Sequence, residues 1–171
     1  MKVIFLDFDR TIFNTDLFYS SLEQNYVFGQ GEHQIEADLN QFIYDDVVDF
    51  LCLCQKNDIA CVLLTFGNRL IQEFKFRATG IESYFKDMLY VERGSKAECI
   101  KKYLETYVSC EKVIFIDDTI EHLEGFVESI PAGRAVRMVR LGAKGSEIKD
   151  NHFEAIENFS NFHFNTSNQS E

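Results

Sequence analysis

The sequence predicts an α/β fold: a parallel sheet with helices on both faces. Short apolar runs alternate with segments of helical periodicity along most of the chain, and this strand–helix–strand alternation is typical of parallel sheets. The apolar runs are continuous rather than alternating, which fits strands that are buried on both sides. Ligands of such sheets bind at the carboxyl ends of the strands, so the residues that end the strands matter most for function.

Six apolar runs are the expected strands, and they cover residues 3–6, 59–64, 88–91, 113–116, 136–141 and 153–156. Three of the strongest runs end in a polar residue, namely Asp7, Thr65 and Asp117. Because the carboxyl ends of parallel strands meet at one edge of a sheet, these three side chains are expected to lie together. This is the main observation from which the sequence predicts a function.

Four helices are expected between the strands, over residues 46–56, 68–78, 95–108 and 119–129. Gly80 follows the second segment and is suited to the end of a helix. Ser95 and Glu98 have the spacing of a capping box at the start of the third. Pro131 stops the fourth.

Residues 12–45 do not fit the alternation and form an insert after the first strand. We expect two short helices, at 16–28 and 32–43, separated by Gly29-Gln30-Gly31, which together make a small helical cap or flap. The rest of residues 1–160 is predicted to be a single core domain. The polar tail 161–171 is expected to fray.

Composition narrows the possible functions. The net charge of −11 argues against nonspecific binding to nucleic acid, which needs clustered Lys and Arg, but a bound divalent cation would still allow a phosphorylated substrate. The hydrophobic run from Val3 is broken at once by Asp7 and Asp9, so we expect no signal peptide, no membrane span and a cytoplasmic protein. Five cysteines without a CxxC pair are expected to be free thiols.

The segment Asp7-Phe8-Asp9-Arg10-Thr11 follows the first strand. Two carboxylates crowded at a strand end repel each other unless a cation or a shared proton compensates. One can be a nucleophile and metal ligand, and the other a general acid and base. The alternative interpretation is a pair of solvated acids in a turn, with Thr11 as a cap.

Thr65 ends the second strand, where its hydroxyl can donate to a phosphate oxygen and the region of Gly67 can present backbone N–H groups. A threonine that caps the next helix is the alternative. Lys96 opens the third helix, where the helix dipole disfavours a cation unless an anion binds nearby. The alternative for Lys96 is a solvated surface lysine.

Asp117 and Asp118 end the fourth strand. Burying a carboxylate after so apolar a run is costly without a cation, and hard oxygen ligands of this kind suit Mg²⁺. The alternative is helix capping by Asp118 or Thr119, which is compatible with a metal site.

Taken in order, the DxDxT motif, the strand-terminal Thr, the Lys and the Asp-Asp pair resemble the four-motif signature of the haloacid dehalogenase-like (HAD) hydrolases, from Val3 to Asp118. The resemblance implies a three-layer Rossmann-like core and a Mg²⁺-dependent phosphatase. Asp7 would form an aspartyl-phosphate, and Asp9 would protonate the leaving group and then activate water. Thr65 and Lys96 would hold the phosphoryl group. The Mg²⁺ ligands would be Asp7, the backbone carbonyl of Asp9, and Asp117 with help from Asp118.

The second acid, Asp9, favours phosphate esters, because dehalogenases and phosphonate-cleaving relatives lack it. Arg10 departs from the family pattern, since many relatives have glycine there; it is either an extra anion-binding group or a solvated arginine. Residues expected to contact the substrate are Arg10, Thr11, Phe66, Gly67 and Asn68, with Phe13, Asn14, Phe18, Tyr19 and Arg69 as further candidates. The alternative for the aromatic residues of the insert is packing against the core.

So small a cap would leave the site open. The substrate would then be large (a phosphoprotein, a nucleic-acid end or a bulky phosphorylated cofactor), or a second copy of the chain would close the site. Three other functions remain open: a phosphotransferase or mutase of the same superfamily, a non-catalytic receiver-like module, and a catalytically silent scaffold.

Overall fold

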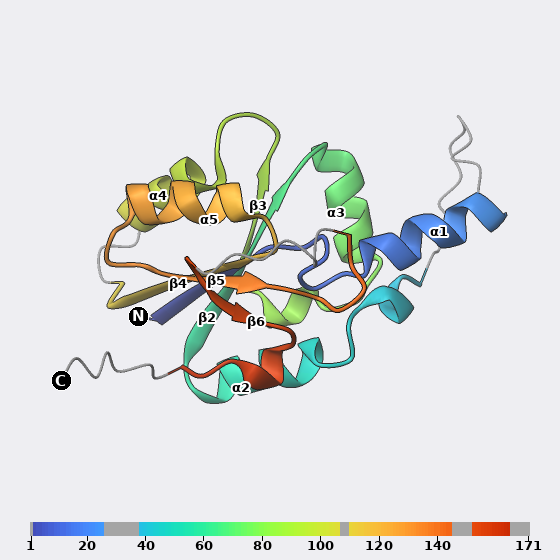
Figure 1. The fold of residues 1–171 in the computed structure, drawn as a ribbon, viewed down its shortest axis with the longest axis horizontal. Coiled ribbons are helices and arrows are strands. Elements are labelled where there is room, and N and C mark those ends of the chain that lie inside the picture. Colours follow the sequence, from blue (N-terminus) through green and yellow to red (C-terminus); the bar gives the residue numbers. More distant parts are fainter. Residues whose placement is uncertain (1, 26–37, 107–109, 145–151, 165–171) are drawn as a thin grey trace.

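The computed structural model describes residues 2–25, 38–106, 110–144 and 152–164. Within these residues six strands form one parallel sheet in the order β3-β2-β1-β4-β5-β6 (Figure 1). The strands are β1 (Lys2–Leu6), β2 (Ile59–Phe66), β3 (Asp87–Val91), β4 (Lys112–Asp117), β5 (Arg134–Met138) and β6 (Glu154–Ile156). The predicted parallel α/β sheet is therefore confirmed, although β5 begins and ends before the expected 136–141.

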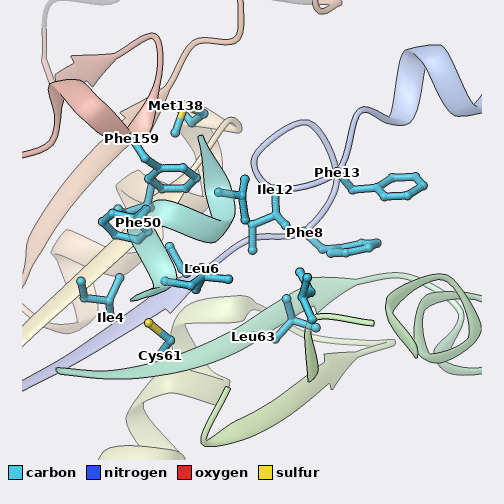
Figure 2. Packing of buried hydrophobic residues seen from close by; sticks show 14 of the residues in the cluster. Ile4, Leu6, Phe8, Ile12, Phe13, Phe50, Cys61, Leu63, Met138 and Phe159 are labelled. Carbon is cyan, nitrogen blue, oxygen red and sulfur yellow. The ribbon is translucent and has the colours of Figure 1, made fainter. Parts of the chain in front are cut away.

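Side chains of β1 alternate between two separate hydrophobic clusters, one on each face of the sheet. Val3 and Phe5 belong to a cluster with residues of α4 (Lys96–Thr106) and α5 (Ile120–Ser129), which lie together over one face (Figure 1). Ile4 and Leu6 point into the other cluster, which contains Phe50 of α2 (Val47–Lys56) (Figure 2). The helices therefore cover both faces, as the continuous apolar strands predicted.

Local capping fixes where two helices begin. Ser95 Oγ accepts from the N–H of Glu98 at 3.1 Å, so half of the expected capping box is well formed at the start of α4. The side chain of Asn68 accepts from the N–H of Ile71 at 3.2 Å and caps α3 (Arg69–Arg77). Both caps place a helix start directly beside the carboxyl edge of the sheet.

The described residues of the insert after β1, 12–25 and 38–45, pack on the core. Its first predicted helix is present as α1 (Thr15–Asn25), whereas the second, expected over 32–43, is a short 3₁₀ helix, Asn40–Phe42, within the described residues 38–43. The helix cannot extend through Ile43, because Ile43 is extended and forms a β-bridge with Phe13. Phe13 and Phe18 are buried in the main cluster, which agrees with the packing interpretation of these aromatic residues.

The described end of the chain also packs on the core. The ring of Phe159 stacks on Phe50 with 4.3 Å between centroids, and Phe162 meets the same ring edge-on at 5.6 Å. The expected frayed tail therefore does not include residues 161–164, and residues 165–171 lie outside the described part of the chain. Among the described helices, none has the length and apolar character needed to cross a bilayer.

Candidate active site

Asp7 and Asp117 lie side by side at the carboxyl edge of the sheet. Leu6 of β1 pairs in register with Ile116 of β4, so the two acids occupy equivalent positions at the ends of adjacent strands. Lys96, in the first turn of α4, joins them: its Nζ donates to Asp7 Oδ1 and, at 2.7 Å, to Asp117 Oδ2. All three side chains are buried, with Lys96 only 2% exposed. The solvated-lysine alternative therefore does not hold.

Burial and charge act against each other in this cluster. Burial raises the pKa of Asp7 well above its ordinary value, while the Lys96 ammonium opposes that change. Burial would also raise the pKa of Asp117, but Lys96 and His122 together hold it low. Burial would lower the pKa of Lys96, but Asp117 and Asp7 raise it, so the amine is a cation. One ammonium thus faces more than one carboxylate.

A third carboxylate completes a possible metal site. Oxygens of Asp7, Asp117 and Asp118 all lie within 4.8 Å of one another, in the part of the chain that the structure describes. These acids outnumber the single cation that bridges two of them, and hard carboxylate oxygens are what Mg²⁺ binds. The donor set therefore fits a divalent cation. The Asp9 carboxylate is not in this group.

The ionisation of Asp118 is expected to make the free energy of unfolding depend on pH, and this dependence can be measured without metal. Burial, followed by the charge of Asp117, raises the pKa of Asp118 from 3.8 to about 6. The folded state thus holds a proton that the unfolded state has lost, so this contribution to stability disappears as pH rises through that window. We expect Asp118→Asn to be more stable than wild type by about 2 kcal/mol at pH 7.5 in a chelator, with the gap closing near pH 4.

Urea unfolding of both proteins across this pH range measures the gap. Adding Mg²⁺ at pH 7.5 is expected to shrink it, because a cation bound by the wild type compensates the same charge. A gap that does not change with pH would contradict this account of Asp118.

Asp9 lies near Asp7 in sequence, but its carboxylate is held by other elements. It accepts from Lys75 Nζ at 2.5 Å, from Gln72 Nε2 at 2.7 Å and from the Thr15 hydroxyl at 2.6 Å. Burial would raise the pKa of Asp9, but the charge of Lys75 and these three hydrogen bonds lower it. Asp9 is therefore neither a solvated acid nor loosely placed. The sequence analysis did not identify Lys75, Gln72 or Thr15.

Thr65 is the last residue but one of β2, its side chain is buried, and its Oγ1 has no hydrogen-bond partner within the described residues. It does not cap α3, because Asn68 does. A buried hydroxyl without a partner is costly, so Thr65 is suited to donate to a ligand oxygen. Phe66, the next residue, is 45% exposed, and its ring lies 6.1 Å from that of His122.

Two backbone amides in the region of Gly67 are already occupied within the protein. The N–H of Gly67 donates to the carbonyl of Val91 at 2.9 Å, so it is not available to a phosphate. Gly67 has a φ of +134°, a region that favours glycine. The N–H of Arg69 is also occupied, by a carboxylate oxygen of Glu92 at 3.1 Å. Glycine is needed here for the turn and not for the ligand.

Thr11 and Arg10 also differ from expectation. Thr11 is fully buried, so its side chain is not open to a substrate, and its Oγ1 has no partner within the described residues. Arg10 has a φ of +59°, a left-handed backbone conformation that favours glycine. Its guanidinium pairs with Asp16 at 3.1 Å, and 31% of the Arg10 side chain is exposed, so it is neither fully solvated nor buried. Arg10 and Asp118 both line a cavity of about 440 Å³.

His122 of α5 is a further residue that the sequence analysis left outside the motif set. Its Nδ1 lies 3.1 Å from Asp117 Oδ2, the oxygen that also accepts from Lys96. Asp117 Oδ1 accepts from the N–H of Thr119 at 2.9 Å. Thr119 occupies the N-cap position of α5 but makes no side-chain capping bond, so the capping alternative is not observed for it.

The comparisons with known proteins show the family of the chain. A family model described as a haloacid dehalogenase-like hydrolase matches residues 4–129, which span the sequence from β1 to the end of α5. The chain belongs to this family of hydrolases. A comparison with curated proteins found no match.

Solved structures of the same superfamily share the fold. A putative haloacid dehalogenase-like hydrolase from Burkholderia xenovorans has a TM-score of 0.73 at 13% identity and covers 93% of this chain and 94% of that one. A putative beta-phosphoglucomutase from Thermotoga maritima has a TM-score of 0.59 at 18% identity, covering 84% and 89%. A phosphatase-domain fragment from Bacteroides fragilis, complexed with Mg, has a TM-score of 0.57 at 17% identity, covering 80% and 36%.

Proposed function

We propose that this hydrolase is a Mg²⁺-dependent phosphatase that cleaves a phosphate monoester through an aspartyl-phosphate on Asp7. The observation that carries the proposal is the buried Asp7, bridged by Lys96 to Asp117 and within reach of Asp118, beside a buried Thr65 hydroxyl without a partner. Phosphoryl transfer needs positioning and charge neutralisation, and this site offers both. The Mg-bound phosphatase domain among the structural relatives supports the proposal by analogy.

The first half of the proposed reaction transfers the phosphoryl group to the protein. A carboxylate oxygen of Asp7 attacks phosphorus, an oxygen–phosphorus bond forms, and the bond to the ester oxygen breaks. Asp9 gives its proton to the departing oxygen. Lys96 orients the Asp7 carboxylate, and the Thr65 hydroxyl donates to a phosphoryl oxygen.

The second half regenerates the enzyme. Asp9, now ionised, takes a proton from water while the water oxygen attacks phosphorus, the bond to Asp7 breaks, and inorganic phosphate leaves. The lowered pKa of Asp9 favours the ionised form that this half requires. The proton that Asp9 takes from water here is the one that it gives to the leaving group in the next cycle.

Asp7, Asp117 and Asp118 would hold the cation, together with the backbone carbonyl of Asp9 that the family resemblance implies. When bound, Mg²⁺ supplies positive charge that neutralises the phosphate oxygens during transfer. The side chain of Asp9 remains turned toward α3 and is left to its proton-transfer role.

The substrate is proposed to be phosphorylated and bulky. The described part of the insert packs against the core through Phe13 and Phe18, while Phe66 and Tyr19 remain half exposed. Phosphopeptides, phosphorylated oligonucleotide ends and phosphorylated cofactors are the classes to compare, with small sugar phosphates as the contrast. A preference for the small sugar phosphates would contradict this part of the proposal.

Turnover of p-nitrophenyl phosphate with Mg²⁺ and with EDTA tests the proposed function. We expect sustained hydrolysis in Mg²⁺ and a loss on the order of 10²-fold or more in EDTA, because carboxylates crowded at the site repel a phosphate dianion. Matching the ionic strength with KCl separates the cation's specific role from screening. Hydrolysis that persists in EDTA would contradict the proposal.

Two further outcomes identify the alternatives. A single phosphorylation of the protein without turnover would identify a receiver-like module. Product phosphate that passes mainly to added alcohols rather than to water would identify a phosphotransferase.

A further inference from the structure

The helix α3 buries two polar side chains and exposes apolar ones. Lys75 and Gln72 are 2% and 7% exposed, whereas Leu70 of the same helix is 78% exposed. Burying an ammonium without a partner would be very costly, so this orientation of the helix requires a compensating contact. Asp9 provides it, through the ion pair with Lys75.

Two aromatic rings and one carboxylate lie next to the ammonium group of Lys75. Its Nζ lies 5.4 Å from the ring centre of Phe8 and 5.3 Å from that of Phe13, and it donates to Asp9 Oδ1 at 2.5 Å. The ammonium therefore has an apolar and aromatic enclosure on one side and the carboxylate on the other.

The side-chain nitrogen of Gln72 makes two hydrogen bonds, whereas its Oε1 is buried without a partner among the described residues. Its Nε2 donates to Asp9 Oδ2 at 2.7 Å and to the carbonyl of Phe66 at 3.0 Å, which ties Asp9 to the end of β2. A Cβ at Gly67 would lie 3.3 Å from this same nitrogen, so the glycine leaves room for the contact.

The two carboxylate oxygens of Asp9 accept different numbers of hydrogen bonds from the described residues. Oδ1 accepts from both Lys75 and Thr15, whereas the described residues provide Oδ2 with Gln72 alone. A carboxylate oxygen accepts about two hydrogen bonds, so Oδ2 keeps one position open and Oδ1 does not. The free acceptor position on Oδ2 is what distinguishes it from Oδ1 as an oxygen for proton exchange.

We propose that Lys75 and Gln72 are positioning residues that orient Asp9 so that Oδ2 is the oxygen that gives and takes the reacting proton. The inference rests on the proposed phosphatase function. In the first half the proton passes from Oδ2 to the ester oxygen as its bond to phosphorus breaks; in the second half a water proton returns to Oδ2. Lys75 acts only through Asp9 and touches no reacting atom.

The test compares substrates that differ in their need for a proton. Phenyl phosphate has a poorer leaving group than p-nitrophenyl phosphate and depends more on a well-placed acid. We expect Lys75→Met to lower kcat/KM about 30-fold for phenyl phosphate and at most about threefold for p-nitrophenyl phosphate. Lys56→Met, which changes an exposed lysine of α2, is the matched control and is expected to change neither value.

A double variant shows whether Lys75 acts through Asp9. Lys75→Met is expected to cause no further loss when Asp9 is already Asn, because the group it orients is gone. Gln72→Leu is the second variant: it removes the donor to Oδ2, and the same dependence on leaving group is expected. It keeps the test decisive if Lys75→Met does not fold.

Equal losses for both phosphates, or an additive loss in the double variant, would overturn this inference while leaving the phosphatase intact. Failure of the wild type to hydrolyse either ester in Mg²⁺ would instead contradict the function on which the inference rests.

Discussion

Asp7→Asn is expected to lower kcat for p-nitrophenyl phosphate by on the order of 10⁴-fold, because it removes the nucleophile of the proposed reaction. An amide has nearly the shape of the carboxylate but does not attack phosphorus at a useful rate. Asp7 is buried at the end of β1, next to Asp117 and Lys96, so few other groups are placed to replace it.

The loss cannot be attributed to unfolding if the variant is at least as stable as the wild type in a chelator. Burial raises the pKa of Asp7, which means that its ionised form destabilises the folded protein near neutral pH. Replacing it with a neutral amide removes that penalty. We therefore expect urea unfolding without metal to show an equal or higher free energy of unfolding for the variant.

Asp58→Asn is the matched control. Asp58 is exposed, lies just before β2 at the opposite edge of the sheet, and has a φ of +53°, a conformation that Asn also adopts. Mass spectrometry of acid-quenched protein provides a second readout: a phosphorylated peptide containing Asp7 is expected from wild type and from Asp58→Asn. An Asp7→Asn protein that keeps more than a few per cent of wild-type turnover would refute Asp7 as the nucleophile.

The sequence predicted the parts of the site that follow from strand ends. Asp7 and Asp117 could be placed together because each directly follows a continuous apolar run, and parallel strands end at one edge. Lys96 could be identified because a lysine is unfavourable at a helix start, and in the structure two carboxylates compensate it. The prediction for Asp7 and Asp117 needed only local patterns and the fold class, whereas the role of Lys96 also needed the resemblance to the family's order of motifs.

The orientation of α3 could not be predicted from its own residues. By apolar pattern, Leu70 and Phe74 favour the core, yet both are exposed while Gln72 and Lys75 are buried. The reason is a contact across the fold, since the partner of both polar side chains is Asp9, in the loop after β1. No periodicity within the helix contains that information.

The surroundings of Gly67 and Thr11 also depend on groups that are distant in the sequence. The Gly67 amide is occupied by Val91 from β3, and the carbonyl of Thr11 accepts from Arg140, far along the chain. Sequence patterns predicted that both segments lie at the site. Which of their groups can contact a ligand depends on the tertiary hydrogen bonds, which the patterns do not contain. The sequence does contain one indication that Thr11 is buried. The two residues that follow it, Ile12 and Phe13, are apolar, and both are fully buried in the structure.

Lys96→Met is expected to show the largest loss of stability among the variants considered. It removes the ammonium that joins Asp7 to Asp117 and leaves two buried carboxylates without that cation. Breaking a buried ion pair by removing one partner typically destabilises a protein by 3–5 kcal/mol, so we expect a loss of about 3 kcal/mol in a chelator at pH 7.5. The activity is expected to fall by on the order of 10³-fold, because Asp7 is no longer oriented.

Mg²⁺ is expected to restore part of the stability of Lys96→Met and to stabilise it more than it stabilises wild type. A cation bound by Asp7, Asp117 and Asp118 neutralises the same carboxylates that have lost the lysine. Urea unfolding with and without Mg²⁺ measures both effects. Lys101→Met, an exposed position on the same helix α4, is the control and is expected to behave as wild type.

The double variant Lys96→Met, Asp7→Asn separates charge from packing. Removing one of the two carboxylates relieves their repulsion, so the double variant is expected to be more stable in a chelator than Lys96→Met alone, although it remains inactive. If Mg²⁺ stabilises Lys96→Met no more than it stabilises wild type, the cation does not bind among these acids. If the double variant is no more stable than the single one, the loss comes from the packing of the lysine stem and not from the uncompensated charge of Asp7.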